Sequence, residues 1–401
     1  MASGVAVRAA SRRSLIGAAA GLTVPVPASA RPAARRGPGA DPSEIERGLE
    51  IVRPDAGAAV AEPLDLGEAL RTLNVPSVGV ALVERGELAW ARAHGAGTST
   101  RTLYQAASLS KTVAACAALR LVRRGRLDLD RDVNARLTSW RVPEGDLARG
   151  RPVTLRGLLS MTGGVGVPGY LGYPPGAPLP GLVQILDGVP PANSPPVRVE
   201  HVPGSRYAYS GGGYEIVQAL VEDATGRPFA DAAQDLVLGP AGMADSLFAQ
   251  PLPRALAARA ATGHTGDGAE LPGGWRVLPE LAAAGLWSTP TDLARLLVEI
   301  ARAYRGAGGR LLDRGMARAM LARQNGGPYG LGGAVAGSGR GLVLMKSGQN
   351  VGCQGYMLVF PEAGHGLVVM TGSDNGTTLA TALIRRAASA YGWPPLGPLM
   401  P

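Results

Sequence analysis

Lysine is almost absent from this 401-residue chain, which has two lysines against 38 arginines. Aromatic residues make up 4% of the sequence, cysteine occurs twice and histidine four times. So few aromatics, and no basic run that interleaves them, argue against nucleic-acid binding, because bases are held largely by stacking on aromatic rings. No Cys-x-x-Cys or His-Glu-x-x-His pattern occurs. A structural or protease-type metal site is therefore not expected, and no cofactor is implied.

Further absences narrow the class of protein. Glycine (58) and proline (33) are frequent but show no three-residue period, which excludes collagen, and two cysteines cannot form a disulfide scaffold. Cys116 and Cys353 are able to pair in an exported protein, but two buried free thiols are the preferred interpretation. Beyond the N-terminal segment no stretch is apolar for about twenty residues, so no transmembrane helix is expected.

Much of the formal net charge of +9 comes from arginines that precede the first acid, Asp41. Residues 1–30 predict an export signal, in which Ser11-Arg12-Arg13-Ser14-Leu15-Ile16 matches a twin-arginine signature and Ala28-Ser29-Ala30 supplies small residues for cleavage. A disordered terminus rich in arginine and alanine is the alternative. Residues 31–58 predict a flexible linker. The mature protein is thus expected to be periplasmic or secreted.

The rest of the chain reads as strands, then helices, then strands again. Residues 77–93 predict a hairpin around Arg85-Gly86, and residues 110–124 predict a largely buried helix. Further helices are expected at 154–161, 213–224, 228–237, 290–304, 312–322 and 377–391, and further strands at 341–346, 353–360 and 366–372. This order predicts one α/β (α+β) domain over residues 60–395. Its antiparallel sheet, flanked by helices, comes from about 60–105 and 285–395, with an all-helical region of about 106–284 inserted.

The two lysines deserve notice because the sequence otherwise uses arginine for positive charge, and only lysine can lose its proton. Lys111 follows Ser108 by three residues where the buried helix begins, so hydroxyl and amine share one helix face. The positive potential of the helix N-terminus favours an alkoxide on Ser108 and a neutral Lys111. A nucleophile with its base is therefore predicted here. Ser110 is the alternative serine, but it points elsewhere on the helix.

Two other segments carry candidate groups. Lys346-Ser347-Gly348 stands at the end of an expected strand and offers an ammonium, a hydroxyl and a glycine that lets substrate approach the backbone. Tyr209 lies on a loop before an expected helix, followed by three glycines that would let its phenol approach other groups. If both lysines flank that phenol, its pKa is expected to fall, because nearby positive charge favours phenolate.

Taken together, S-x-x-K at Ser108, Tyr209-Ser210-Gly211 and Lys346-Ser347-Gly348 resemble the motifs of serine β-lactamases and penicillin-recognising hydrolases. The resemblance is closer to the class C-like branch, which includes esterases, D-aminopeptidases and D,D-peptidases, and it covers about residues 65–395. Further similar stretches are Leu155–Ser160, Asp223–Phe229, Gly239–Met243, Ala284–Pro290, Gly327–Gly332 and Gly352–Tyr356.

The resemblance implies a serine hydrolase whose site lies between a sheet domain and a helical domain. Ser108 would be the acylated nucleophile, Lys111 its base partner and Tyr209 a proton shuttle. Lys346 would set the potential at the tyrosine or bind a substrate carboxylate. The backbone N–H groups of Ser108 and Gln349 would hold the oxyanion. A small-molecule or peptide-like acyl compound is the expected substrate, without nucleic acid, and no oligomeric state is predicted.

One departure from the pattern bears on substrate. Gly211 stands where β-lactamases carry an asparagine that contacts the substrate's amide side chain, so a less selective pocket is expected. The sequence therefore favours an esterase or amidase. A true β-lactamase, a D,D-peptidase, an acyltransferase and a penicillin-sensor-like binding domain that does not turn over are the alternatives. Gly263-His264-Thr265-Gly266 is a weaker candidate for the third motif, and Gly164–Gly169 matches G-x-G-x-x-G but reads as a loop.

Overall fold

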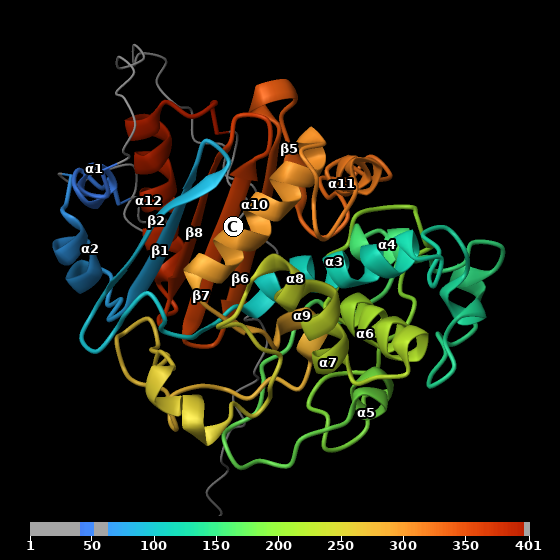
Figure 1. Cartoon of the computed structure of the whole chain (residues 1–401). Coiled ribbons are helices and arrows are strands. Elements are labelled where there is room, and N and C mark those ends of the chain that lie inside the picture. The colour runs from blue at the N-terminus through green and yellow to red at the C-terminus, as the bar shows by residue number, and fades with distance from the viewer. Residues whose placement is uncertain (1–40, 52–62, 397–401) are drawn as a thin grey trace, which may run out of the picture.

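The computed structural model describes residues 41–51 and 63–396. Its centre is a six-stranded antiparallel sheet with the order β2-β1-β8-β7-β6-β5 (Figure 1). The strands are β1 (Val78–Glu84), β2 (Glu87–His94), β5 (Ala334–Ala336), β6 (Val343–Asn350), β7 (Cys353–Phe360) and β8 (His365–Thr371). A separate two-stranded ladder joins β3 (Tyr104–Gln105) to β4 (Trp287–Ser288). Strands from both ends of the chain thus build one sheet, which confirms the predicted fold class.

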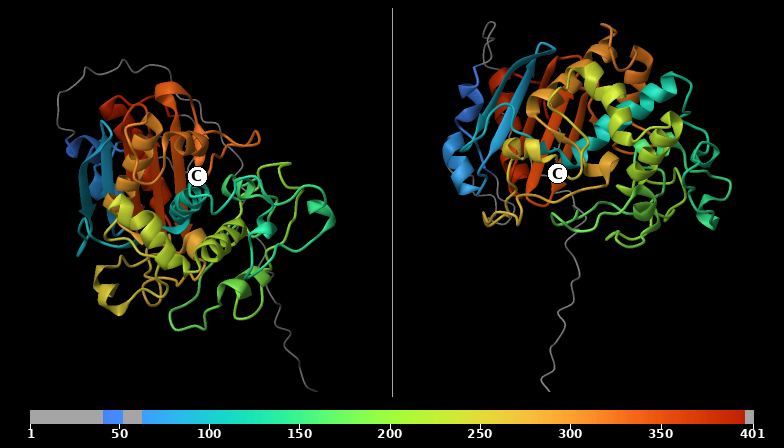
Figure 2. Two further views of the ribbon diagram at one scale, coloured as in Figure 1. Left: turned by 45° about the vertical axis from the view of Figure 1, so that its right-hand side comes forward. Right: turned by 60° about the horizontal axis from the view of Figure 1, so that its bottom comes forward.

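The helices cover both faces of this sheet and form a second region beside it (Figures 1 and 2). The sheet's helices are α1 (Ser43–Glu46), α2 (Leu66–Thr72), α10 (Pro290–Arg305), α11 (Arg314–Met320) and α12 (Gly376–Tyr391). The helical region contains α3 (Ser110–Arg123), α4 (Leu155–Leu159), α5 (Leu182–Asp187), α6 (Gly212–Thr225), α7 (Phe229–Ala233), α8 (Gly239–Ala241) and α9 (Leu281–Ala284). Short 3₁₀ turns occupy Ala107–Leu109, Val133–Ala135, Asp146–Ala148, Arg254–Arg259 and Gly339–Gly341.

Strand β1 shows how one strand serves two cores. Val78, Val80 and Leu82 belong to the core shared with α1, α2 and α12. Ala81 and Val83 face the larger core, which contains α3, α6 and α10. Because side chains alternate across a strand, a nearly continuous apolar run is what a sheet buried on both faces requires. The run of small and branched residues therefore places β1 inside the sheet, between β2 and β8.

Several boundaries differ from the sequence predictions. Residues 43–51, expected in a linker, instead contain α1, and Ile45 and Leu49 are buried in the sheet's core because this segment packs beside α12. The helix expected over 228–237 is α7 followed by a π-helical turn, Gln234–Leu238. The predicted export signal lies outside the described residues. Among the described residues no helix is long and apolar enough to span a membrane.

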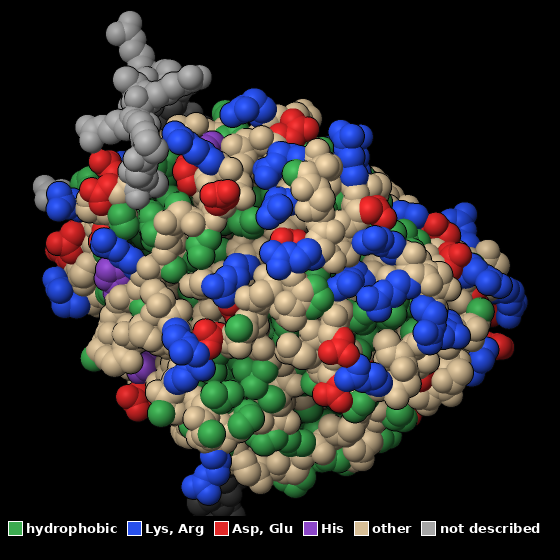
Figure 3. Space-filling view, viewed as in Figure 1, with side chains coloured by type: hydrophobic (Ala, Val, Ile, Leu, Met, Phe, Trp, Pro, Cys, Tyr) green, Lys and Arg blue, Asp and Glu red, His purple; other side chains and the backbone are tan. Residues whose placement is uncertain are grey.

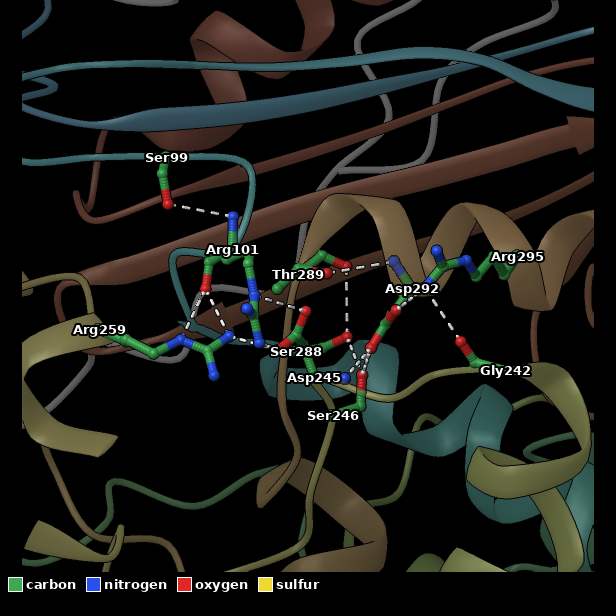
Figure 4. Close-up of polar contacts among 10 residues, drawn as sticks. All are labelled: Ser99, Arg101, Gly242, Asp245, Ser246, Arg259, Ser288, Thr289, Asp292 and Arg295. Atoms are coloured by element: carbon green, nitrogen blue, oxygen red, sulfur yellow. Dashed lines mark hydrogen bonds and ion pairs between the residues drawn. The ribbon is translucent and has the colours of Figure 1, made fainter. Parts of the chain in front are cut away.

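A buried polar cluster fixes the start of α10 (Figure 4). The Asp292 carboxylate accepts hydrogen bonds from the Asp245 backbone N–H at 2.8 Å and from the Ser246 hydroxyl at 2.9 Å. The Ser246 and Ser288 hydroxyls lie 2.8 Å apart, which ties this cluster to β4. Since β4 pairs with β3, just before Ser108 in the chain, the cluster steadies the segment that carries the candidate nucleophile.

Charged groups are distributed over the face shown in Figure 3 rather than gathered in one stripe. Lys and Arg side chains cover much of this face, with Asp and Glu side chains between them. Several arginines of the protein are paired, as in the contacts of Arg101 and Arg259 with Asp245.

Candidate active site

The candidate nucleophile lies on a tight, strained turn. Ser108 is the middle residue of the 3₁₀ turn Ala107–Leu109, which continues directly into α3. Ala107 has a φ of 49°, a left-handed conformation that costs a non-glycine residue on the order of 1 kcal/mol. Ala107 is fully buried, whereas Ser108 stays partly exposed. The buried core therefore keeps this turn in its strained conformation, and the Ser108 side chain remains partly exposed.

Lys111 is directed at that hydroxyl. Its Nζ atom donates hydrogen bonds to Ser108 Oγ at 3.1 Å and to the Ala283 carbonyl at 2.8 Å. The residue is 1% exposed. Burial lowers the pKa of Lys111, and the nearby Lys346 lowers it further, whereas Tyr209 and Glu215 oppose that shift. The predicted serine–lysine pair is therefore in contact, and its amine is in surroundings that favour the neutral form.

Ser110, the alternative serine, is occupied elsewhere. Its hydroxyl donates to the Ala107 carbonyl at 2.6 Å and accepts the Leu286 backbone N–H at 3.1 Å, and the residue is fully buried. These contacts tie the strained turn to the segment before β4. Ser110 has a structural position and does not face the lysine.

Tyr209 lies between the two lysines, as the sequence suggested. Its ring centroid is 5.2 Å from Lys111 Nζ and 5.1 Å from Lys346 Nζ. The edge of Tyr329 packs against the same ring, with centroids 6.2 Å apart and planes at 74°. The loop before α6 therefore places the phenol near both amines, and Tyr329, which the sequence did not single out as a site residue, packs beside its ring.

Lys346 sits within β6 and not at its end, because this strand continues to Asn350. Its Nζ atom donates to the Ser347 carbonyl at 2.7 Å, and the residue is 3% exposed. Burial lowers the pKa of Lys346 to about 7. The longer strand carries Lys346, Ser347, Gly348 and Gln349 past the turn that holds Ser108.

Gly348 is the point where β6 touches that turn. A Cβ atom at this position would lie 2.5 Å from the Ala106 carbonyl oxygen and 3.0 Å from the Ser108 backbone nitrogen. Only glycine permits this approach. The peptide bond between Gly348 and Gln349 consequently lies beside the backbone of Ser108, so the two N–H groups expected to hold an oxyanion come from neighbouring segments.

Gly211 is closely covered by the loop that precedes Tyr209. Its backbone N–H donates to the Val167 carbonyl at 2.8 Å, and a Cβ atom at position 211 would lie 3.0 Å from Cε2 of Tyr170. The G-x-G-x-x-G match is part of this same loop, and Val167 within it has a φ of 60°. The space that an asparagine side chain would need at position 211 is thus partly filled by Tyr170.

The other candidate motif and the histidines have structural surroundings. His264 is 7% exposed, its Nδ1 atom lies 2.9 Å from the Gly372 carbonyl, and its segment belongs to none of the strands β1–β8. Cys116 and Cys353 are buried free thiols, as preferred from the sequence, and burial raises the pKa of each to about 12. Within residues 41–51 and 63–396 no group of three or more His, Cys, Asp or Glu side chains is arranged to hold a metal ion.

Two buried acids beside the site were not selected from the sequence. Glu215 and Glu280 are both 0% exposed, and Glu215 Oε1 accepts the Ala283 backbone N–H at 3.1 Å. The sequence did contain an indication of these acids, because Glu215 interrupts an apolar run and Glu280 precedes an alanine run whose composition predicts burial. A charged residue within a buried pattern is rare unless it is paired.

The sequence of this chain is similar to those of several known proteins. A sequence model of the Beta-lactamase family matches residues 59–392. Esterase EstB of Burkholderia gladioli is 32% identical over 257 residues, 58% of this chain and 63% of the esterase. Penicillin-binding protein 4 of Amycolatopsis lactamdurans is 29% identical over 208 residues, 50% of this chain and 51% of that protein. The matches thus span roughly half to three fifths of these curated relatives.

The fold is also similar to those of solved structures. The octameric penicillin-binding protein homologue from Pyrococcus abyssi superposes with a TM-score of 0.61 at 21% identity, over 80% of this chain and 75% of that one. At this identity the likeness concerns the fold alone. Because the family model covers most of the chain, this protein belongs to the Beta-lactamase family.

Proposed function

We propose that this protein is an exported serine hydrolase that cleaves an ester or amide through an acyl-enzyme on Ser108. The supporting observation is the 3.1 Å contact between Lys111 Nζ and Ser108 Oγ, made by an amine that is almost fully buried. A serine hydroxyl is a weak nucleophile unless a base adjoins it. Export rests on the signal proposed for residues 1–30.

The first half-reaction forms the acyl-enzyme. Neutral Lys111 takes the hydroxyl proton as Ser108 Oγ bonds to the substrate's carbonyl carbon. The negative charge that develops on the carbonyl oxygen is held by the backbone N–H groups of Ser108 and Gln349. The bond to the leaving alcohol or amine then breaks, and Tyr209 supplies the proton that the leaving group takes up.

The second half-reaction releases the acid. Water attacks the acyl carbon and gives its proton to Tyr209, and Ser108 regains its proton from Lys111 as the acyl bond breaks. Lys346, 5.1 Å from the Tyr209 ring, stabilises the phenolate electrostatically or contacts an anionic substrate group. Ser347 and Gly348 line the approach of the substrate along β6.

An esterase or amidase fits the site best. At position 211 Tyr170 stands in the space of an amide-binding side chain, which disfavours the acyl side chains of penicillins and peptides. The similarity to an esterase points the same way. A D,D-peptidase or β-lactamase is the second candidate, because Lys346 offers an ammonium to a substrate carboxylate and a penicillin-binding protein is among the relatives.

Intact-mass measurement tests the proposal. The purified protein and Ser108→Ala are mixed separately with a p-nitrophenyl ester and a cephalosporin, and turnover is followed in parallel. We expect an adduct or turnover that requires Ser108, faster with the ester. Lys111→Ala should reduce the rate by at least about 100-fold, as loss of a general base commonly does. A lasting adduct without turnover would indicate a penicillin-sensor-like domain, and transfer to an added alcohol an acyltransferase. Full activity in Ser108→Ala would refute the proposal.

A further inference from the structure

Glu215 and Glu280 bring two carboxyl groups into the protein interior beside Lys111. Both residues are 0% exposed. One oxygen of Glu215 and both oxygens of Glu280 are buried without a hydrogen-bond partner, as is the hydroxyl of Tyr170. An ionised carboxylate is strongly disfavoured in such a place unless it is paired. The catalytic scheme above assigns neither glutamate a part.

A chain of hydrogen bonds connects Glu215 to Lys111 through a single residue. Glu215 Oε1 accepts the backbone N–H of Ala283 at 3.1 Å, and the carbonyl of the same residue accepts from Lys111 Nζ at 2.8 Å. One turn further along α6, Gln218 Oε1 accepts the Ala282 N–H at 3.2 Å. Helix α9 has four residues and is too short to be stable alone, so these side chains of α6 hold it in place.

The two glutamates also meet at this short helix. Glu280 immediately precedes α9, and Glu215 binds the N–H of its third residue. Burial raises the pKa of Glu215 well above its usual range and the neighbouring Glu280 raises it further, while burial raises the pKa of Glu280 to about 7. Neither oxygen of Glu280 has a hydrogen-bond partner, so the two carboxyl groups do not share a proton, and burial favours the protonated, uncharged form of each.

Lys111 and Glu215 each face several charged or titratable groups. Lys111 faces Tyr209 from the loop before α6, Tyr214 and Glu215 from α6, and Lys346 from β6. Glu215 faces Glu280, Lys111 and Tyr170, with Glu222 further along its own helix. Glu215 is thus the acid that influences the lysine directly, and Glu280 acts on it through Glu215.

Resting on the base role proposed for Lys111, we propose that Glu215 is a positioning residue for this lysine and that it acts as an uncharged carboxyl group. Glu215 fixes the Ala283 carbonyl that orients the amine. An uncharged carboxyl places no negative charge beside the amine, and so keeps a neutral Lys111 accessible near neutral pH.

The pH profile tests whether Glu215 is uncharged. Glu215→Gln keeps an oxygen for the Ala283 N–H and removes no charge, so the acid limb of kcat/KM should stay in place. Glu280→Gln should likewise leave the limb in place. An ionised Glu215 would instead hold the proton on Lys111, and its replacement would move the limb to lower pH by about 0.5–1 pH unit.

The experiment measures kcat/KM for a p-nitrophenyl ester between pH 5 and 9 in both variants. The second-order rate of Ser108 inactivation by a fluorophosphonate, followed by intact mass, provides the same profile without turnover. Glu222→Gln is the matched control, since it changes a partly buried glutamate on the same helix and should leave the limb in place. Glu215→Ala should lower kcat at least about tenfold, with rescue by Glu215→Gln, because it removes the acceptor for Ala283.

A limb that lies at lower pH in Glu215→Gln than in the control would overturn the inference, because it would mean that an ionised carboxylate adjoins Lys111. An unchanged kcat in Glu215→Ala, or a loss that Glu215→Gln does not rescue, would overturn the positioning role. If Glu215→Ala does not fold, the limb of Glu215→Gln still tests the uncharged carboxyl. Ser108→Ala separates the two proposals. Loss of labelling in Ser108→Ala with an unchanged kcat in Glu215→Ala refutes only the positioning role, whereas undiminished activity in Ser108→Ala refutes the proposed function.

Discussion

Lys111 Nζ lies 3.1 Å from Ser108 Oγ, although the serine is partly exposed and the lysine is 1% exposed. The contact joins a surface group that a substrate can reach to an amine that water hardly reaches. The contact depends on the tight turn at Ala107, whose left-handed backbone conformation an ordinary helix start does not have.

Ser110 holds the turn at Ala107–Leu109 in place, so its replacement should lower the stability of the protein and leave the acylation step intact. Ser110→Ala leaves the Leu286 N–H without its acceptor in a fully buried place and should lower the free energy of unfolding by about 1–3 kcal/mol. Ser108→Ala should change that free energy little and abolish acylation. Urea unfolding and intact-mass labelling of both variants test this division, and a loss of acylation in Ser110→Ala alone would reverse the assignment of the two serines.

Gly348 should be essential because β6 touches the turn there. In Gly348→Ala the added methyl would meet the Ala106 carbonyl at 2.5 Å, so strand and turn must separate. Displacing one oxyanion donor costs about 100- to 1000-fold in kcat. Gly341→Ala is the matched control, since the nearest atom to its added carbon lies 3.8 Å away. Steady-state kinetics with an ester tests this, and equal activity in both variants would argue against an oxyanion site at this contact.

The sequence predicted the elements that local pattern decides. The hairpin turn at Arg85-Gly86, the buried helix α3 and the three adjacent strands β6, β7 and β8 follow from turn residues and from apolar periodicity. Strands β3 and β4 have two residues each, and they exist only because Tyr104 and Ser288 meet across the fold. No local window contains that information.

The same limit applies to the site. Ser108 and Lys111 lie on one turn, so their spacing alone predicts the contact between them. Glu215 and Ala283 are 68 residues apart, and their hydrogen bond arises from the packing of α6 against α9. The occupied space at Gly211 depends similarly on Tyr170 from another loop. The sequence therefore predicted the groups that the structure brings together at Ser108, and it did not predict the groups that surround them.

Position 211 should control the acceptance of amide side chains. Gly211→Asn places its Cβ atom 3.0 Å from Tyr170 and should destabilise the protein by about 1–3 kcal/mol through overpacking. The double variant Gly211→Asn/Tyr170→Ala makes room for the side chain and should gain rate toward a cephalosporin relative to an ester.

Gly145→Asn is a suitable control, because no atom lies within 4 Å of its added carbon. Its thermal unfolding and its ratio of cephalosporin to ester turnover should match those of the unmodified protein. If the double variant shows that same ratio, Tyr170 is not what limits the acyl pocket.

Lys346 should make both stability and substrate preference depend on pH. Its folded pKa is about 7, below the ordinary lysine value, so between pH 7 and about 10 the unfolded chain binds more protons than the folded one. The free energy of unfolding therefore rises with pH across this window and falls as pH drops toward 7, where the buried amine takes up its proton. In Lys346→Met this contribution is absent, so urea unfolding between pH 7 and 9 should give a flatter profile.

The titration of Lys346 should also change the substrate preference. The KM for an ester that bears a carboxylate should increase above pH 7, while the KM for a neutral ester should not, because only the ammonium form attracts the anion. Parallel KM profiles for the two esters would place Lys346 beside Tyr209 alone and remove it from substrate binding.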